Sequence, residues 1–224
     1  MAFVLSLFAL ILSYLVGSIP FGLLIVKFST GKDIRKVASG RTGGTNAMRA
    51  AGIFAGAGTI ILDFLKGFLT VWLARLLVPA DVSWKVWIEI LAPVAAILGH
   101  NYSIFLAERN EKGQLRLRGG AGGATTVGGA AGLWWPSALV IIPVALLILF
   151  GVGYASVATM STAVMAMVIF GYQAYKGALP WEYILYGVLA EIVLMIALQP
   201  NIVRLLHGTE RLVGWRARGK DKVE

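Results

Sequence analysis

The chain has 224 residues, of which 58% are hydrophobic and 14% are charged, and its mean hydropathy is +0.79. This composition excludes a soluble globular domain, a disordered chain and a fibrous repeat. A helix needs roughly 20 residues to cross the bilayer core, so the chain has room for about six to eight spans. We therefore expect residues 1–224 to form a single polytopic membrane domain.

Charge and cysteine content narrow the classes of partner. A net charge of +9 on a membrane protein indicates contact with anionic headgroups and an asymmetric distribution of charged loops, rather than binding to nucleic acid. The absence of cysteine excludes disulfides and thiolate metal sites, and two histidines are too few for a histidine-rich metal site. We expect membrane lipids as partners, no metal, no cofactor and no obligate protein partner.

The apolar segments predict an all-α fold with about seven transmembrane helices. The first is the uncharged run Ala2–Val26, a retained helix rather than a signal peptide, because no basic region precedes it. Helix-breaking residues divide the rest of the apolar sequence. The further predicted spans are Gly52–Val78, Trp84–Leu106, Gly119–Trp134, and three more separated by breaks at residues 134–136, 151–153 and 176–180. The span Gly119–Trp134 is short and glycine-rich, so we expect it to be partly re-entrant or packed tightly against its neighbours.

The basic residues predict the topology. Sixteen of the twenty Lys and Arg residues lie in three short segments, at about residues 27–50, 107–122 and 200–224. The positive-inside rule places all three at the cytoplasmic face. With seven crossings, the N-terminus lies outside and the C-terminus in the cytoplasm.

Ionisable side chains within the spans indicate internal polar contacts, because such groups are costly in lipid. Asp63 and Lys66 are three residues apart and share one helical face, so they form either an intrahelical ion pair or part of a polar cavity. His100 lies at the cytoplasmic end of the third span. Glu191 lies in the middle of the last span, and the sequence offers no partner for it.

Two cytoplasmic segments have the composition of an anion site. Ser39–Arg49 and Arg118–Thr126 combine glycines, hydroxyls and bases, although neither matches a Walker A or a dinucleotide fingerprint. Each by itself is also typical of a flexible polar loop. Ser156 and the cluster of Asn201, Arg204 and Glu210 fall at the same face, which favours one shared pocket for phosphate or carboxylate.

Seven motifs in this order resemble those of the bacterial acyl-phosphate:glycerol-3-phosphate acyltransferases, integral membrane enzymes of phospholipid synthesis. The resemblance covers nearly the whole chain. The matching segments are Gly17–Gly22, Ser39–Arg49, Leu62–Gly67, Gly99–Tyr102, Gly119–Thr125, Gly153–Ser156 and Asn201–Glu210.

The resemblance implies transfer of a fatty acyl group from acyl phosphate to glycerol 3-phosphate, giving lysophosphatidic acid at the cytoplasmic face of a bacterial plasma membrane. No protein base is expected, because the family is thought to use a substrate phosphate to take the proton. The implied acyl-phosphate ligands are Ser39, Gly40, Gly43, Thr45, Asn46, Gly120 and Thr125. The implied glycerol-phosphate ligands are Arg49, Ser156, Asn201 and Glu210, while Asp63, Lys66 and His100 would shape the cavity.

This sequence departs from the family pattern at three positions. Arg41 stands where the family usually has asparagine, Ala121 where it has lysine, and Leu198 where it has histidine. Since the lysine and histidine are expected to help bind glycerol phosphate, Arg41 and Arg118 are further candidates for that role. Two other hypotheses remain: an acyltransferase with a different phosphorylated polyol acceptor, and a non-catalytic protein that binds or transports anionic lipid or phosphate.

Overall fold

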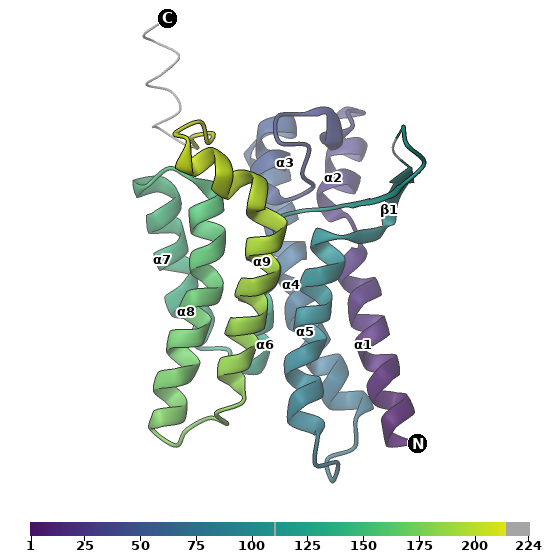
Figure 1. Ribbon diagram of the computed structural model, residues 1–224, viewed down its shortest axis with the longest axis vertical. Helices are drawn as coiled ribbons and strands as arrows, with labels where there is room; N and C mark the ends of the chain where they lie inside the picture. Colours follow the sequence, from purple (N-terminus) through teal and green to yellow (C-terminus); the bar gives the residue numbers. More distant parts are fainter. Residues whose placement is uncertain (110, 214–224) are drawn as a thin grey trace, which may run out of the picture.

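The computed structural model describes residues 1–109 and 111–213, which form a bundle of helices with one small hairpin (Figure 1). The elements are α1 (Ala2–Ser18), α2 (Phe21–Thr30), the short 3-10 helix η1 (Ile34–Lys36), α3 (Gly44–Ala51), α4 (Ile53–Leu77), α5 (Lys85–Asn101), β1 (Ser103–Arg109), β2 (Leu115–Arg118), α6 (Gly123–Leu133), α7 (Ser137–Gly151), α8 (Ala155–Tyr175) and α9 (Tyr183–Leu206). Within the described residues, three helical segments are long and apolar enough to cross a membrane: Ala2–Thr30, Ala155–Tyr175 and Tyr183–Leu206.

The described parts of the three basic segments lie at one end of the bundle, which we call the basic end. Figure 1 shows α2, α3, the hairpin and the last turns of α9 gathered there, while α1 begins at the opposite end. Residues 214–224 of the third predicted segment lie outside the described residues. Asn201 and Arg204 belong to the last turns of α9.

The first predicted span is not one helix. The prediction of a continuous helix over Ala2–Val26 is wrong, because α1 ends at Ser18 and α2 begins at Phe21. Pro20 has no N–H and disfavours the helical conformation of the residue before it. Ile19 is accordingly extended, with φ −60° and ψ 118°. Across the break the Ile19 carbonyl accepts from Phe21 N at 3.1 Å, and its second lone pair can meet another donor.

The predicted span Trp84–Leu106 is wrong at its C-terminal end. Helix α5 stops at Asn101, and the apolar residues that follow form β1, which pairs with β2 in an antiparallel hairpin. The Tyr14 hydroxyl donates to the Tyr102 carbonyl at 2.8 Å, and Ser103 Oγ donates to the Ser18 carbonyl at 2.6 Å. These contacts with α1 hold the chain as it leaves α5. The segment outside the bundle therefore starts at Ser103 rather than at residue 107.

Glycines bring α4 and α6 into close contact, as the sequence predicts for its short glycine-rich span. Helix α6 has 11 residues and is about 16 Å long, and nine of its residues are buried. A Cβ atom on Gly67 would overlap the Thr125 carbonyl oxygen, and one on Gly128 would overlap the Phe64 carbonyl oxygen. The expectation of tight packing is confirmed.

The main hydrophobic core lies among α5, α6, α8 and α9. The Phe170 ring packs edge-on against Tyr183 and Tyr186, and the Tyr186 hydroxyl donates to the Thr126 carbonyl at 2.6 Å. At the far end of α6, Arg75 donates to the Gly132 carbonyl at 2.9 Å. These contacts fix α6 at both ends, and with it the N-terminal turn that faces the basic end.

Asp63 and Lys66 form the predicted ion pair, with Nζ 2.9 Å from Oδ1 and both side chains almost completely buried. Lys66 Nζ also donates to the carbonyl of Ile19 at 3.2 Å, at the break between α1 and α2. On the other side, His100 Nδ1 lies 3.5 Å from Asp63 Oδ1. The three side chains, which we call the ion cluster, join α4, α5 and the break.

The glycine contacts predict an ordering of variants. Gly67→Ala and Gly128→Ala should each lower the melting temperature of the detergent-solubilised protein, because overpacking typically costs about 1–3 kcal/mol. Gly58→Ala is the matched control, since its Cβ would meet only a side-chain atom of Ile25 at an ordinary 3.5 Å. Equal melting temperatures for all three variants would contradict the close α4–α6 contact.

The ion cluster predicts a non-additive pair of substitutions. Lys66→Met should destabilise the protein by about 3–5 kcal/mol, because it leaves the buried Asp63 carboxylate without its cation. The double variant Asp63→Asn/Lys66→Met removes both charges and should recover most of that loss. Thermal unfolding of the single and double variants tests this, and a double variant no more stable than Lys66→Met would argue against a buried pair.

Candidate active site

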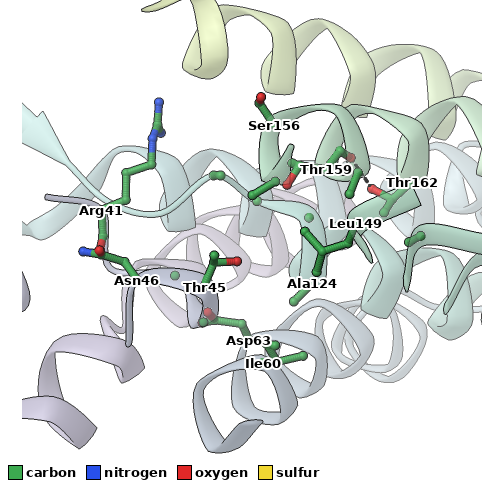
Figure 2. Close-up of a pocket in the computed structure, with 18 of the residues that line it drawn as sticks. Arg41, Thr45, Asn46, Ile60, Asp63, Ala124, Leu149, Ser156, Thr159 and Thr162 are labelled. Atoms are coloured by element: carbon green, nitrogen blue, oxygen red, sulfur yellow. Dashed lines mark hydrogen bonds between the residues drawn. The ribbon is translucent and has the colours of Figure 1, made fainter. Parts of the chain in front are cut away.

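A cavity of about 540 Å³ opens at the basic end and extends between the helices (Figure 2). Its polar part is lined by residues from the loop before α3, the first turns of α3, α6 and α8, and the end of α9. Its apolar part is lined by α4, α6, α7 and α8. The predicted site residues that line it are Ser39, Arg41, Gly43, Thr45, Asn46, Arg49, Asp63, His100, Ser156, Asn201 and Glu210.

The other predicted site residues lie behind the wall of the cavity or away from it. Gly40 forms a turn with φ +69°. Gly120 packs against His100 so closely that any side chain at position 120 would overlap the imidazole ring. Thr125 is fully buried, and its Oγ1 has no hydrogen-bond partner in the described part of the chain. Lys66 does not line the cavity, but it forms an ion pair with Asp63, which does.

Asn46 shapes the loop before α3. Its amide nitrogen lies within hydrogen-bond distance of three carbonyl oxygens, at 3.2 Å from Ile34, 3.0 Å from Val37 and 2.8 Å from Arg41. These contacts close the loop around the amide, since the Asn46 nitrogen meets the backbone on both sides of the turn. Asn46 thus holds its neighbours in place, and since it also lines the cavity, its role as a phosphate ligand stays a prediction.

Three helix N-termini meet at the cavity. Gly43–Thr45 at the start of α3, Gly122–Ala124 at the start of α6 and Ala155–Ser156 at the start of α8 all line it. The first N–H groups of a helix have no partner within the helix, and the helix dipole places positive potential there. None of the three first turns contains an acidic residue. The cavity is therefore suited to bind anions through backbone groups.

Arginines add fixed positive charge to the polar part. Arg41, Arg49, Arg204 and Arg211 line the cavity, while the lining carboxylates are Asp63 and Glu210. Asp63 is paired with Lys66, and Glu210 accepts from Arg204 at 2.9 Å. Burial lowers the pKa of Arg41 and of Arg49, and the nearby guanidiniums of Arg204 and Arg211 respectively lower these pKa values further. Both remain charged, so the polar part is cationic.

Arg41 bridges the loop before α6 and helix α9. Its guanidinium donates to the Gly120 carbonyl at 2.9 Å, to the Ala197 carbonyl at 2.6 Å and to Asn201 Oδ1 at 3.1 Å. Two of these acceptors, Gly120 and Ala197, directly precede Ala121 and Leu198 in the sequence. Ala121 and Leu198 both line the cavity. The charge of Arg41 thus lies beside the two positions where the family pattern has lysine and histidine.

Arg118 has a different environment from Arg41. It lies at the end of β2, where its Nε is 2.8 Å from the carboxylate of Glu108 on β1. It does not line the cavity. The structure therefore separates the two arginines that the sequence treated as equivalent candidates.

The residues after α9 form a strap across the polar part. Leu212 pairs with Tyr154, and Val213 N donates to the Gly153 carbonyl at 2.8 Å. Arg49 Nη2 donates to the Leu212 carbonyl at 3.3 Å. These contacts bring Glu210, which accepts from Asn201 at 2.8 Å, to the same wall as Ser156.

The apolar part is a groove that opens sideways out of the bundle. Ile61 on α4 and Leu146 on α7 line it and are also 57% and 46% exposed. Figure 2 shows Ile60, Ala124, Leu149, Thr159 and Thr162 around this part. The sequence does not single out these residues, because an aliphatic residue that lines a groove has the same hydropathy as one that packs in a core.

Comparisons with known proteins cover most of the chain. The family model described as "Glycerol-3-phosphate acyltransferase" matches residues 7–208. A glycerol-3-phosphate acyltransferase of Gloeobacter violaceus is 36% identical over 203 residues, covering 90% of this chain and 92% of that protein. A relative of the same name from Thermotoga petrophila is 37% identical over 203 residues, covering 91% and 94%.

Two solved structures have the same fold. The crystal structure of PlsY, an integral membrane glycerol 3-phosphate acyltransferase, in its glycerol 3-phosphate form has a TM-score of 0.75 and 32% identity, covering 93% of this chain and 96% of that one. The lysophosphatidic acid form of PlsY gives a TM-score of 0.73 and 30% identity, covering 93% and 95%. Sequence and fold together confirm the resemblance that the ordered motifs indicated, and the chain belongs to the glycerol-3-phosphate acyltransferase family.

Proposed function

We propose that this protein transfers a fatty acyl group from acyl phosphate to glycerol 3-phosphate, giving lysophosphatidic acid and phosphate in phospholipid synthesis. Besides family membership, one observation supports this reaction: the cavity joins a cationic end, built on three helix N-termini, to an apolar groove that opens sideways. An acyl phosphate has the same two parts, an anionic head and a long apolar chain.

The reaction needs orientation and charge stabilisation more than a nucleophilic side chain, because an acyl phosphate is already an activated mixed anhydride. The acceptor hydroxyl oxygen attacks the acyl carbonyl carbon, the new ester bond forms, and the bond to the phosphate oxygen breaks with its electron pair on the phosphate. The hydroxyl proton passes to a substrate phosphate. Preorganised N–H groups would stabilise the charge that develops on the carbonyl oxygen.

The donor phosphate is assigned to the loop before α3 and the first turns of α3 and α6. Thr45 offers its hydroxyl to the cavity, Ser39 and Gly43 complete its wall, and Asn46 and Gly40 hold the shape of the loop. Gly120 and Thr125 support this region from behind. The acyl chain would follow the groove between α4 and α7.

Glycerol 3-phosphate is assigned to the opposite wall, where Arg49, Ser156, Asn201 and Glu210 line the cavity. Ser156 Oγ is buried and has no hydrogen-bond partner within the described residues, so it is available to a ligand. We assign Arg41 the role of the missing family cation, because its planar fork suits a phosphate and it lies beside Ala121 and Leu198.

The membrane topology is part of the proposal. Seven crossings would be made by α1 with α2, then by α4, α5, α6, α7, α8 and α9, with the N-terminus outside and the basic end in the cytoplasm of a bacterium. Helix α1 begins at one end of the bundle and α9 ends at the other (Figure 1), which supports an odd number of crossings. The clustering of the basic segments at one end supports the orientation.

An acyl-transfer assay tests the proposed function. Purified protein given synthetic acyl phosphate should acylate glycerol 3-phosphate, and should leave unphosphorylated glycerol unmodified because the cationic end would then lack its anion. Other phosphorylated polyols serve as competing acceptors. Faster acylation of one of them would reassign the acceptor, and no transfer to any acceptor would favour a non-catalytic protein that binds anionic lipid.

Arg41 and Arg118 should differ in kinetics. Arg41→Ala should raise the KM for glycerol 3-phosphate by roughly 10- to 100-fold, the usual worth of a hydrogen bond to a charged group, and should change the KM for acyl phosphate less. Arg118→Ala, assayed in the same detergent, is the matched control and should leave both KM values unchanged. Ala121→Lys should partly restore acceptor binding in the Arg41→Ala background. Unchanged acceptor kinetics in Arg41→Ala would remove it from the acceptor site.

The topology predicts where single cysteines react, and the chain has no native cysteine to interfere. Gly113→Cys in the hairpin turn and Thr209→Cys after α9 should react with an impermeant maleimide only in inside-out vesicles. Asp81→Cys, between α4 and α5, should react only in right-side-out vesicles. Reaction of Gly113→Cys and Thr209→Cys from opposite sides would exclude the proposed number of crossings.

A further inference from the structure

The β1–β2 hairpin lies at the level where the bilayer core ends. Helices α1 and α5 have 17 residues each and are about 26 Å long, close to the ~30 Å thickness of the hydrocarbon. The hairpin leaves from the same ends of both helices, where Ser103 Oγ donates to the Ser18 carbonyl. Figure 1 shows it projecting sideways from the bundle, with its turn directed toward the basic end.

The order of residues along the hairpin suits this level. Near its base, Ile104 and Phe105 are exposed, Phe105 by 58%. Farther out, Arg109 lies opposite Leu115 in the strand register, and Leu115 is 63% exposed. Arg116 lies opposite Glu108 in the same register. Apolar and aromatic side chains at the hydrocarbon boundary with cations beyond them are the arrangement of a segment that rests in a membrane interface.

The charge of the region is positive after its ion pairs are formed. Residues 103–118 carry four cations against two carboxylates, Glu108 and Glu111, and Glu108 forms an ion pair with Arg118. Among the ion pairs of the described residues, none includes Arg109 or Arg116, although Arg109 donates to the Gly113 carbonyl at 3.0 Å.

The hairpin is continuous with the wall of the cavity. Its first strand follows His100 by three residues, and its second runs directly into Gly119. The Gly119 carbonyl accepts from Thr42 N at 3.2 Å, and Gly120 N donates to the His100 carbonyl at 2.9 Å. Anything that restrains the hairpin therefore also restrains the loop between β2 and α6.

We propose that the β1–β2 hairpin is a binding surface for the anionic phospholipid headgroups of the adjacent leaflet, and that this contact steadies the loop between β2 and α6. Exposed Phe105 and Leu115 enter the interface, and Arg109 and Arg116 contact headgroup phosphates. The leaflet is the cytoplasmic one in the proposed topology, but the contact itself requires neither that orientation nor acyl transfer.

A single label on the full-length chain tests this contact. Leu115→Cys provides the only thiol, which carries an environment-sensitive fluorophore after reconstitution into nanodiscs of phosphatidylcholine alone or mixed with phosphatidylglycerol. In the anionic discs the emission should shift to the blue and be quenched by brominated lipid. In neutral discs both effects should be weaker.

Charge variants separate a specific contact from simple proximity. Arg109→Gln and Arg116→Gln should each raise the anionic fraction needed for the shift, consistent with a roughly fivefold loss of binding for each cation removed. Lys176→Gln, at the opposite end of the bundle, is the matched control and should have no effect. A label equally exposed to water in both kinds of disc, as for a hairpin that awaits a protein partner, would overturn the proposal. So would a shift that the two arginine variants leave unchanged.

Discussion

The buried ion pair of Asp63 and Lys66 is the interaction on which the geometry of the site depends. Two charges within a membrane protein are costly unless each is paired and hydrogen-bonded. Lys66 meets this condition by also donating to the Ile19 carbonyl at the break before Pro20, and Asp63 by contacting His100. His100 in turn fixes the loop before α6. Its backbone carbonyl accepts from Gly120 N, and its ring packs so closely against Gly120 that only glycine fits at that position. One pair of charges thus connects a broken helix to the cavity wall.

The anion-binding character of the cavity comes first from the backbone. Helices α3, α6 and α8 begin at the same place, and the close contact of Gly67 and Gly128 with the backbones of α6 and α4 keeps the first turn of α6 there. Backbone dipoles held in this way do not reorganise when charge develops, which is the condition for effective transition-state stabilisation. The arginines then supply net charge, and Asn46 and Glu210 hold the backbone and side chains around them.

The cavity places opposite requirements on its two ends. The cationic end needs helix termini and arginines within reach of water-soluble phosphates, so it is built from loops and from the strap that carries Glu210 and Leu212. The apolar end needs only small or aliphatic residues between α4, α7 and α8, and it remains open at its side. An amphipathic donor with an anionic head and an apolar chain can occupy both ends at once.

Much about this protein can be predicted from its sequence, because local properties determine it. Composition predicts a helical membrane protein, the i,i+3 spacing predicts the pairing of Asp63 with Lys66, and ordered short motifs indicate the family. The tertiary structure alone decided that β1 replaces the end of a predicted span, that Arg41 rather than Arg118 reaches the cavity, and that Asn46 closes its loop. Hydrophobic periodicity shows which face of a segment avoids water but not which distant segment it meets. The partners of Arg41 lie 79, 156 and 160 residues away along the chain, so only folding brings them together.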